Sequence, residues 1–176
     1  INLFQKPKID IIFLQCGVGS WPASCIWYYL NRYKINRPKI VLVEPNEASG
    51  VLSSFMHNQR VSPKGNFETI MAGLNCGIPS KSAWEIIKKG CDAVMTISDE
   101  DARNAMRTLY KPKENDKRII SGESGSAGLA GLIKCIKDPG MSKLNKYIGL
   151  NSKSRILLFN TEGDTDKESF KSIVEL

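Results

Sequence analysis

Residues 9–20 constrain the fold most strongly, and they read Ile-Asp-Ile-Ile-Phe-Leu-Gln-Cys-Gly-Val-Gly-Ser. The apolar run is typical of a parallel strand buried on both faces. Gly17 and Gly19 then allow backbone amides to approach a ligand closely, and we expect Ser20 to cap a following helix. This order indicates an anion-binding loop, for which phosphate is the expected ligand. Glycine turns also join strands to helices for structural reasons alone, so the motif needs support from the rest of the chain.

Short apolar runs alternate with amphipathic segments along the whole chain. We expect strands at residues 9–14, 39–44, 91–97 and 155–159. We expect helices at residues 21–33, 47–56, 82–89, 99–110, 124–137, 141–148 and 166–174, with Ser98 capping the helix that begins at residue 99. This alternation predicts an α/β fold: a three-layer parallel sheet with helices on both faces. No linker interrupts it, so residues 1–176 are expected to form a single α/β lobe.

Composition excludes several classes of protein. Five widely spaced cysteines without a C-x-x-C pair predict neither a disulfide framework nor a metal site, and they favour a reducing, cytoplasmic location. No apolar run approaches the roughly 20 residues that span a bilayer, and the first residues lack a signal-peptide core, so no membrane partner is expected. The net charge of +7 is dispersed among acidic residues, and no nucleic-acid partner is expected either.

Three polar or glycine-bearing loops stand out against this fold. They are residues 17–20, the Ser-Gly-Glu-Ser-Gly segment at 121–125, and the Asn-Thr-Glu-Gly-Asp-Thr-Asp segment at 160–166. Each is compatible with an ordinary cap or turn when taken alone. In parallel α/β sheets, ligands bind beyond the carboxyl ends of the strands, so we expect these loops to contribute to one site.

Two common nucleotide motifs are excluded by spacing. Gly17 and Gly19 are followed by Pro22 where G-x-G-x-x-G requires a third glycine for close helix packing. Glu44 stands where a ribose-binding acid is expected, but Pro45 follows it directly. The G-x-x-x-x-G-K-[ST] motif of nucleoside-triphosphate loops is absent from the sequence.

Four motifs, in this order, resemble pyridoxal-phosphate enzymes of fold type II, the group of tryptophan synthase β and threonine deaminase. They are the loop at 17–20, Val-Glu-Pro at 43–45, Gly-Glu-Ser-Gly at 122–125 and the polar loop at 160–166. Within the group, the chain is most similar to the diaminopropionate ammonia-lyase family. The similar segments are residues 15–20, 32–33, 37–39, 69–77, 120–125 and 161–166. The chain departs from the family pattern at Cys16, where a small residue is expected, and at Asn160, where a serine is expected.

The resemblance implies pyridoxal 5′-phosphate as cofactor and the cofactor-phosphate-binding half of the large domain as fold. It implies that the backbone amides of Gly17, Val18 and Gly19, with Ser20 assisting, anchor the phosphate at the start of the first helix. Pro22, in the first turn of that helix, lacks only an amide that would have had no helical partner.

The resemblance also places residues near the cofactor ring. Thr161 is implied to meet the pyridine nitrogen, and Asn160 is the rival for this position. Glu123 is implied to lie beside the ring edge, or else it stabilises the first turn of the helix at 124–137.

The resemblance finally implies that the lysine-bearing half of the family's enzymes is absent from this sequence. The family's Schiff-base lysine lies in an N-terminal half that nothing in these residues matches, so the chain is expected to be the C-terminal part of a longer enzyme. It then holds no catalytic residue and is inactive alone. The complete enzyme, by resemblance a homodimer acting on an amino acid, is expected to convert 2,3-diaminopropionate to pyruvate and ammonia by αβ-elimination. The alternatives are a serine/threonine dehydratase-like lyase, a non-catalytic module that binds a phosphate ligand, and a basic nucleic-acid-binding domain.

Overall fold

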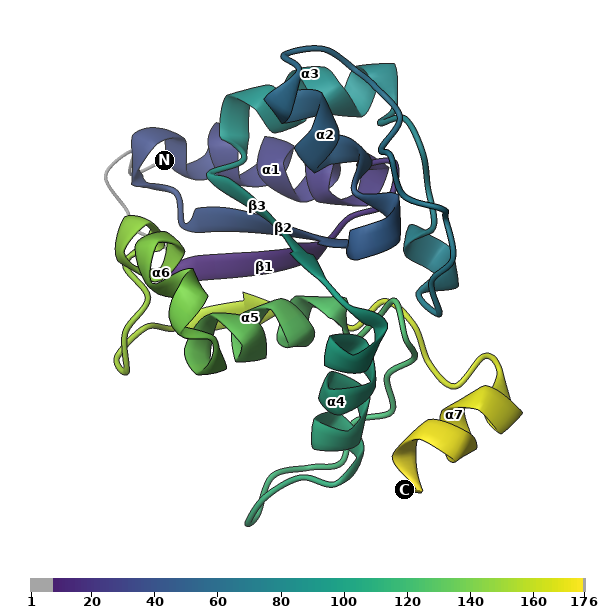
Figure 1. Ribbon diagram of the computed structural model, residues 1–176. Coiled ribbons are helices and arrows are strands. Elements are labelled where there is room, and N and C mark those ends of the chain that lie inside the picture. The colour runs from purple at the N-terminus through teal and green to yellow at the C-terminus, as the bar shows by residue number, and fades with distance from the viewer. Residues whose placement is uncertain (1–7, 176) are drawn as a thin grey trace.

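A computed structural model describes residues 8–175, and its centre is a four-stranded parallel sheet (Figure 1). The strands are β1 (Ile11–Gln15), β2 (Lys39–Pro45), β3 (Ala93–Ile97) and β4 (Ile156–Leu158), in the spatial order β3-β2-β1-β4. The first three strands therefore lie side by side in sequence order, whereas β4 pairs with the opposite edge of β1. The sheet reverses its direction of winding between β1 and β4, which is where ligands bind in folds of this kind.

Helices cover both faces of this sheet. The α-helices are α1 (Ser20–Tyr33), α2 (Gly50–Met56), α3 (Lys81–Gly90), α4 (Asp99–Tyr110), α5 (Ala127–Lys137), α6 (Ser142–Ile148) and α7 (Lys167–Val174). Short 3₁₀ turns are η1 (Lys34–Asn36), η2 (Asn46–Ala48), η3 (Ala72–Leu74) and η4 (Pro139–Met141). Helices α1, α2 and α3 lie on one face and α5 and α6 on the other, while α4 and α7 extend past the end of the sheet (Figure 1). The expected three-layer α/β fold is confirmed.

Burial of β1 on both faces explains why its sequence is continuously apolar. Ile12 and Leu14 pack against α1, α2 and α3, whereas Ile11 and Phe13 pack against α5 on the opposite face. Neighbouring side chains in a strand point to opposite faces, so a strand between two helical layers needs apolar residues at every position. Gln15, the last residue of β1, is the exception: it is polar and equally buried.

Most predicted elements match the structure within one to three residues at each end. Ser98 caps α4 as expected: its hydroxyl oxygen accepts a hydrogen bond from the N–H of Asp101 at 3.2 Å, and the carboxylate of Asp101 accepts one from the N–H of Ser98 at 2.8 Å. The predicted helix at 47–56 instead divides into η2 and α2. The helix predicted from residue 124 begins only at Ala127, because the preceding residues form a separate turn.

Of the expectations drawn from composition, the one about membrane-spanning segments can be compared with the structure. Among residues 8–175, no helix has the length and hydropathy that a membrane crossing requires. The expectation about a signal-peptide core concerns the first residues, most of which lie outside the described part of the chain.

The Val-Glu-Pro corner at the end of β2 anchors α2 to the sheet. Glu44 is fully buried, and its two carboxylate oxygens accept hydrogen bonds from the N–H groups of Val51 at 2.8 Å and Leu52 at 2.9 Å. These amides belong to the first turn of α2, where they have no helical acceptor. Burial raises the pKa of the Glu44 carboxyl from 4.5 to about 7, although these two hydrogen bonds oppose the shift. Glu44 is therefore a structural acid with a strongly perturbed proton affinity.

This raised pKa predicts that the protein loses stability as the pH rises through the range from about 5 to about 7. In this window the folded protein keeps a proton on Glu44 that the unfolded chain releases, so the free energy of unfolding must fall as the proton is lost. The shift from 4.5 to about 7 corresponds to about 3 kcal/mol at full effect. Urea denaturation at about pH 5 and about pH 8 measures the difference.

The control is Glu44→Gln, which has no proton to release in this range. We expect this variant to be less stable than the wild type at the lower pH, because an amide nitrogen cannot accept from a backbone N–H. Its stability should nevertheless change less between the two pH values. An equal pH dependence in both proteins would show that Glu44 does not titrate with the raised pKa.

Candidate functional site

The glycine loop between β1 and α1 forms one wall of the candidate site. Gly19 is the N-cap of α1 and has a φ of 91°, a left-handed conformation that L side chains rarely adopt. A Cβ at this position would lie 2.6 Å from Cδ1 of Ile87. At Gly17, a Cβ would lie 3.0 Å from Sγ of Cys76 and 3.2 Å from the carbonyl oxygen of Gly73. The loop follows its path because both positions are glycine.

The backbone amides of this loop are available to a ligand. Within residues 8–175, no protein atom accepts a hydrogen bond from the N–H groups of Gly17, Val18, Gly19 or Ser20. The first turn of α1 contains no acidic residue, so the positive end of the helix dipole is not neutralised locally. Four unpaired donors at a helix N-terminus form a site suited to an anion such as phosphate.

Ser20 occupies a different position from the one expected. Its predicted role as the N-cap of α1 is wrong, because Gly19 holds the N-cap position and Ser20 is the first helical residue. The left-handed conformation at Gly19 starts the helix one residue earlier than a serine cap would. The side chain of Ser20 is exposed and contributes to the wall of the cavity, where it can reach the same ligand as the loop amides.

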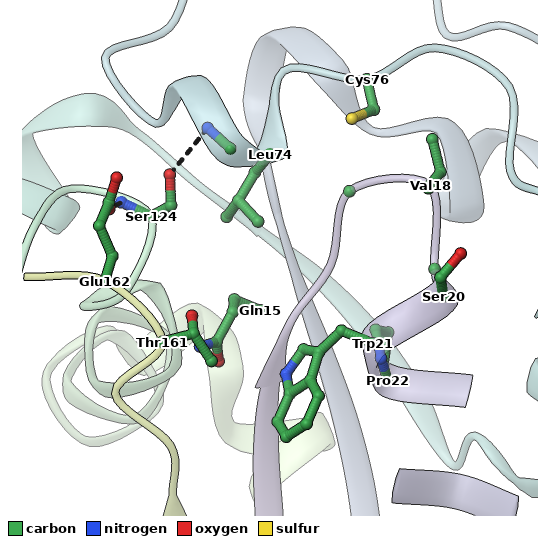
Figure 2. A pocket seen from close by; sticks show the side chains of 13 residues that line it. Gln15, Val18, Ser20, Trp21, Pro22, Leu74, Cys76, Ser124, Thr161 and Glu162 are labelled. Atoms are coloured by element: carbon green, nitrogen blue, oxygen red, sulfur yellow. Dashed lines mark hydrogen bonds between the residues drawn. The ribbon is translucent and has the colours of Figure 1, made fainter. Parts of the chain in front are cut away.

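A cavity of about 520 Å³ lies between the glycine loop and the loops that follow β4 and precede α5. Figure 2 shows Val18 and Ser20 on one side of it and Thr161, Glu162 and Ser124 on the other. The residues that line it are Gln15, Gly17, Val18, Gly19, Ser20, Trp21, Pro22, Gly73, Leu74, Cys76, Ser124, Thr161 and Glu162. The cavity thus joins the carboxyl ends of β1 and β4, at the reversal point of the sheet.

Five of the seven predicted site residues line this cavity. They are Gly17, Val18, Gly19, Ser20 and Thr161. The hydroxyl oxygen of Thr161 accepts a hydrogen bond from Nε2 of Gln15 at 2.6 Å, which fixes Thr161 against the end of β1.

Glu123 and Asn160 lie outside the cavity wall. Oε1 of Glu123 accepts a hydrogen bond from the hydroxyl of Ser169 at 2.7 Å, so this carboxylate points toward α7. The amide nitrogen of Asn160 donates to the carbonyl oxygen of Ile120 at 2.7 Å, which joins the two loops behind the cavity. In the structure, Glu123 thus joins its loop to α7, and Asn160 joins the loop after β4 to the segment before α5.

Glu162 lines the cavity, although the sequence pattern gave it no role. Its Oε2 accepts hydrogen bonds from the N–H groups of Ser124 at 2.6 Å and Gly125 at 3.1 Å. The hydroxyl of Ser124 accepts in turn from the N–H of Gly73 at 3.0 Å (Figure 2). Hydrogen bonds therefore connect the segment at Gly73, the loop at 121–125 and the loop at 160–166. The N–H groups of Ser124 and Gly125, just before α5, already donate to the carboxylate of Glu162.

Gln15 and Glu162 could not be found from sequence for the same reason. Each forms its contacts with residues more than 35 positions away in the sequence, and no local pattern reports such a partner. Gln15 nevertheless carried a signal: it is a polar residue at the end of an apolar strand, next to the glycine loop. A polar side chain at the carboxyl end of a buried strand is a candidate site residue on position alone.

Two cysteines, Cys16 and Cys76, lie near the loop. Burial raises the pKa of the Cys16 thiol well above its ordinary value, and the nearby Glu44 carboxylate adds to the effect. Cys16 therefore stays protonated at neutral pH and acts as a small packing residue. Cys76 lines the cavity, and its sulfur fills the space that a side chain at residue 17 would need.

The chain belongs to the family of pyridoxal-phosphate dependent enzymes, whose family model matches residues 2–150. Among curated proteins, it is 35% identical over 163 residues to diaminopropionate ammonia-lyase of Escherichia coli. It is 33% identical over 173 residues to the enzyme of the same name from Salmonella typhimurium. These matches cover 93% and 97% of the chain but only 41% and 43% of the two relatives.

Solved structures give the same relationship. The crystal structure of the Escherichia coli diaminopropionate ammonia-lyase in complex with D-serine superposes with a TM-score of 0.86 at 33% identity, over 96% of this chain and 42% of that one. A tomato threonine deaminase superposes with a TM-score of 0.76 at 17% identity, over 95% of this chain and 44% of that one, and this likeness concerns the fold alone. The fold is thus the α/β fold of fold type II pyridoxal-phosphate enzymes.

The residues present fit the cofactor of this family. Four unpaired amides at the N-terminus of α1 suit a phosphate, and a Cβ at Gly19 would collide with Ile87 and change the loop. At the other side of the same cavity, Thr161 offers a hydroxyl to a polar atom of the ligand.

The glycine loop predicts an unequal cost for two alanine substitutions. Gly19→Ala should destabilise the protein by about 2–4 kcal/mol, because it combines positive φ with a collision against Ile87. Gly149→Ala is the matched control: Gly149 has a φ of 74°, but no atom lies within 4 Å of the place that an added Cβ would take, so we expect only about 1–2 kcal/mol. Urea denaturation measures both. Equal costs would show that the contact between the loop and α3 does not constrain residue 19.

Proposed function

We propose that this chain is the cofactor-phosphate-binding part of a diaminopropionate ammonia-lyase. The observation that carries the proposal is the cavity itself, because it joins the unpaired amides of residues 17–20 to the hydroxyl of Thr161. The identity of 35% to the Escherichia coli enzyme supports this substrate assignment over others in the family. The complete protein would act on 2,3-diaminopropionate and release pyruvate and ammonia.

The chain's own residues bind and orient the cofactor in this proposal. The N–H groups of Gly17, Val18 and Gly19 donate to the phosphate oxygens, and the hydroxyl of Ser20 adds a further donor. The dipole of α1 stabilises the negative charge. Trp21, whose ring packs edge-on against Phe159 at a centroid distance of 5.1 Å, forms the wall between this phosphate site and β4.

Thr161 holds the opposite end of the cofactor. Its hydroxyl meets the pyridine nitrogen, while Asn160 keeps the loop in place through the carbonyl oxygen of Ile120. When bound, pyridoxal phosphate supplies the electron sink that makes a proton on the substrate Cα removable. A neutral hydroxyl partner leaves the ring nitrogen less protonated than a carboxylate would.

The catalytic groups come from outside this chain in our proposal. The cavity wall formed by the described residues contains no lysine, and the chain spans about two fifths of the length of the curated relatives it matches. We infer that a lysine-bearing part closes the cavity and supplies the Schiff-base lysine. The complete enzyme is then a homodimer, as the family resemblance implies, and is located in the cytoplasm, as the cysteine pattern favours. This chain alone is inactive.

Binding of a phosphorylated cofactor analogue tests the site in this chain. Pyridoxine 5′-phosphate is the appropriate probe, since it has no aldehyde and forms no Schiff base with surface lysines. Isothermal titration should show saturable binding that weakens at least about tenfold for pyridoxine, because loss of the phosphate removes several charge-assisted hydrogen bonds. Equal affinity for the two compounds would contradict a phosphate site at residues 17–20.

Activity of the full-length protein tests the assignment of the reaction. We expect pyruvate release from 2,3-diaminopropionate with pyridoxal phosphate bound, and a much lower specificity constant with threonine or serine. Preference for threonine or serine would favour the dehydratase-like alternative. Binding of the phosphorylated probe without any turnover by the full-length protein would favour a non-catalytic module.

A further inference from the structure

Gln15 is a buried polar residue at the point where the sheet reverses. It ends β1, it is 2% exposed, and it lines the cavity. A glutamine in such a position costs free energy unless its amide groups are paired. The hydrogen-bond partners of Gln15 therefore indicate the role of its side chain.

The orientation of the Gln15 amide is determined by Phe159, the residue that directly follows β4. Its Nε2 donates to the carbonyl oxygen of Phe159 at 3.0 Å, and a carbonyl oxygen can only accept. The amide nitrogen must face the carbonyl of Phe159, because the reverse orientation would place two oxygens against each other. The same Nε2 donates its second hydrogen to Oγ1 of Thr161 at 2.6 Å.

This arrangement leaves the other end of the Gln15 amide without a partner. Oε1 is buried and accepts no hydrogen bond within residues 8–175. It lies 3.6 Å from the position that a Cβ on Gly128 of α5 would take. An unpaired buried acceptor costs about 1–3 kcal/mol. The amide therefore keeps its hydrogen bonds to Phe159 and Thr161 although this orientation leaves Oε1 of Gln15 unpaired.

The bond from Gln15 restricts the proton of Thr161. A hydroxyl carries one proton and two lone pairs, and Gln15 occupies one lone pair. The proton cannot turn toward Nε2 of Gln15, since an N–H group lies there, and it is confined to the remaining directions. Because Thr161 lines the cavity, these directions include the cavity side. Accepting one hydrogen bond also strengthens the donation of another.

We propose that Gln15 is a positioning residue that directs the Thr161 hydroxyl proton at the ring nitrogen of the bound cofactor. A hydroxyl that donates to this nitrogen stabilises its unprotonated form. The pKa of the ring nitrogen is then lower with Gln15 present than with a residue that leaves the hydroxyl free to rotate. This inference rests on the proposed cofactor site. It adds that Gln15 influences the protonation of the cofactor ring nitrogen through its hydrogen bond to Thr161.

The test measures the pKa of the cofactor ring nitrogen directly. Pyridoxine 5′-phosphate labelled with ¹⁵N in the ring is bound to the chain, and ¹⁵N NMR is recorded across a pH series for the wild type and for Gln15→Met. Methionine has a similar length and no donor. We expect the pKa of the bound ring nitrogen to be higher in Gln15→Met by about half a pH unit or more. An unchanged pKa would overturn the proposal.

Thr161→Val separates positioning from a general structural effect. In this background the hydroxyl is absent, so Gln15→Met should leave the pKa of the bound ring nitrogen unchanged. If the effect of Gln15→Met persists without the hydroxyl, Gln15 acts by another route and the proposal is wrong. Thr165→Val, an exposed position in the same loop, is the matched control and should behave as the wild type.

A second variant covers the case in which Gln15→Met does not fold. An ionised carboxylate in Gln15→Glu accepts a hydrogen bond from the Thr161 hydroxyl, whose oxygen then presents only lone pairs to the cavity, so the pKa of the ring nitrogen should rise further than in Gln15→Met. The negative charge of the introduced carboxylate also raises the pKa of the ring nitrogen. The double variant Gln15→Glu/Thr161→Val measures this contribution of charge alone. A rise that is no larger with the hydroxyl present than without it would overturn the proposal.

The failure of this inference and the failure of the proposed function are distinguishable. If the wild-type chain does not bind pyridoxine 5′-phosphate, the cofactor site itself is contradicted and the inference falls with it. If the wild type binds the probe and the pKa of the bound ring nitrogen is the same in Gln15→Met, only the positioning role is wrong.

Discussion

The parallel pairing of β1 with β4 is the constraint on which the rest of the structure depends. Phe13 lies opposite Leu158 in this pairing, so the two strands end side by side and their loops enter the same space. Because β2 occupies the other edge of β1, this is the point at which the sheet reverses. This pairing brings the unpaired amides at the start of α1 and the hydroxyl of Thr161 to the same cavity. A strand of three residues at the edge of the sheet therefore brings together a site whose parts are about 140 residues apart in sequence.

Local sequence patterns were sufficient for much of this architecture. The apolar run of β1 and the two glycines after it predicted both a buried strand and an anion-binding loop, because these properties depend on neighbouring residues alone. The same holds for the capping of α4 by Ser98, which needs only Asp101 three positions away. Ser20 shows the limit of this reasoning: a serine before a helical segment is a common cap, but the left-handed backbone of Gly19 starts the helix one residue earlier.

The remaining site contacts could not be derived from pattern because their partners are distant. Glu123 lies in the loop that leads into α5, as expected, yet its carboxylate turns to Ser169 on α7. Glu162 takes the amides of Ser124 and Gly125, which no spacing rule connects to it. Family resemblance supplied Thr161, whereas the hydrogen bond from Gln15 required the three-dimensional arrangement. The family of the chain was thus more visible in the sequence than the contacts that hold the candidate site together.

The central claim is that residues 17–20 and Thr161 form a single cofactor site in this chain. Amide NMR spectra recorded while pyridoxine 5′-phosphate is added test this claim most directly, since each backbone N–H reports its own environment. We predict saturable shifts concentrated at Gly17, Val18, Gly19, Ser20 and Thr161, with one common dissociation constant. Shifts confined to another surface, such as the groove between α1 and α3 that Trp27 and Ser82 line, would contradict it.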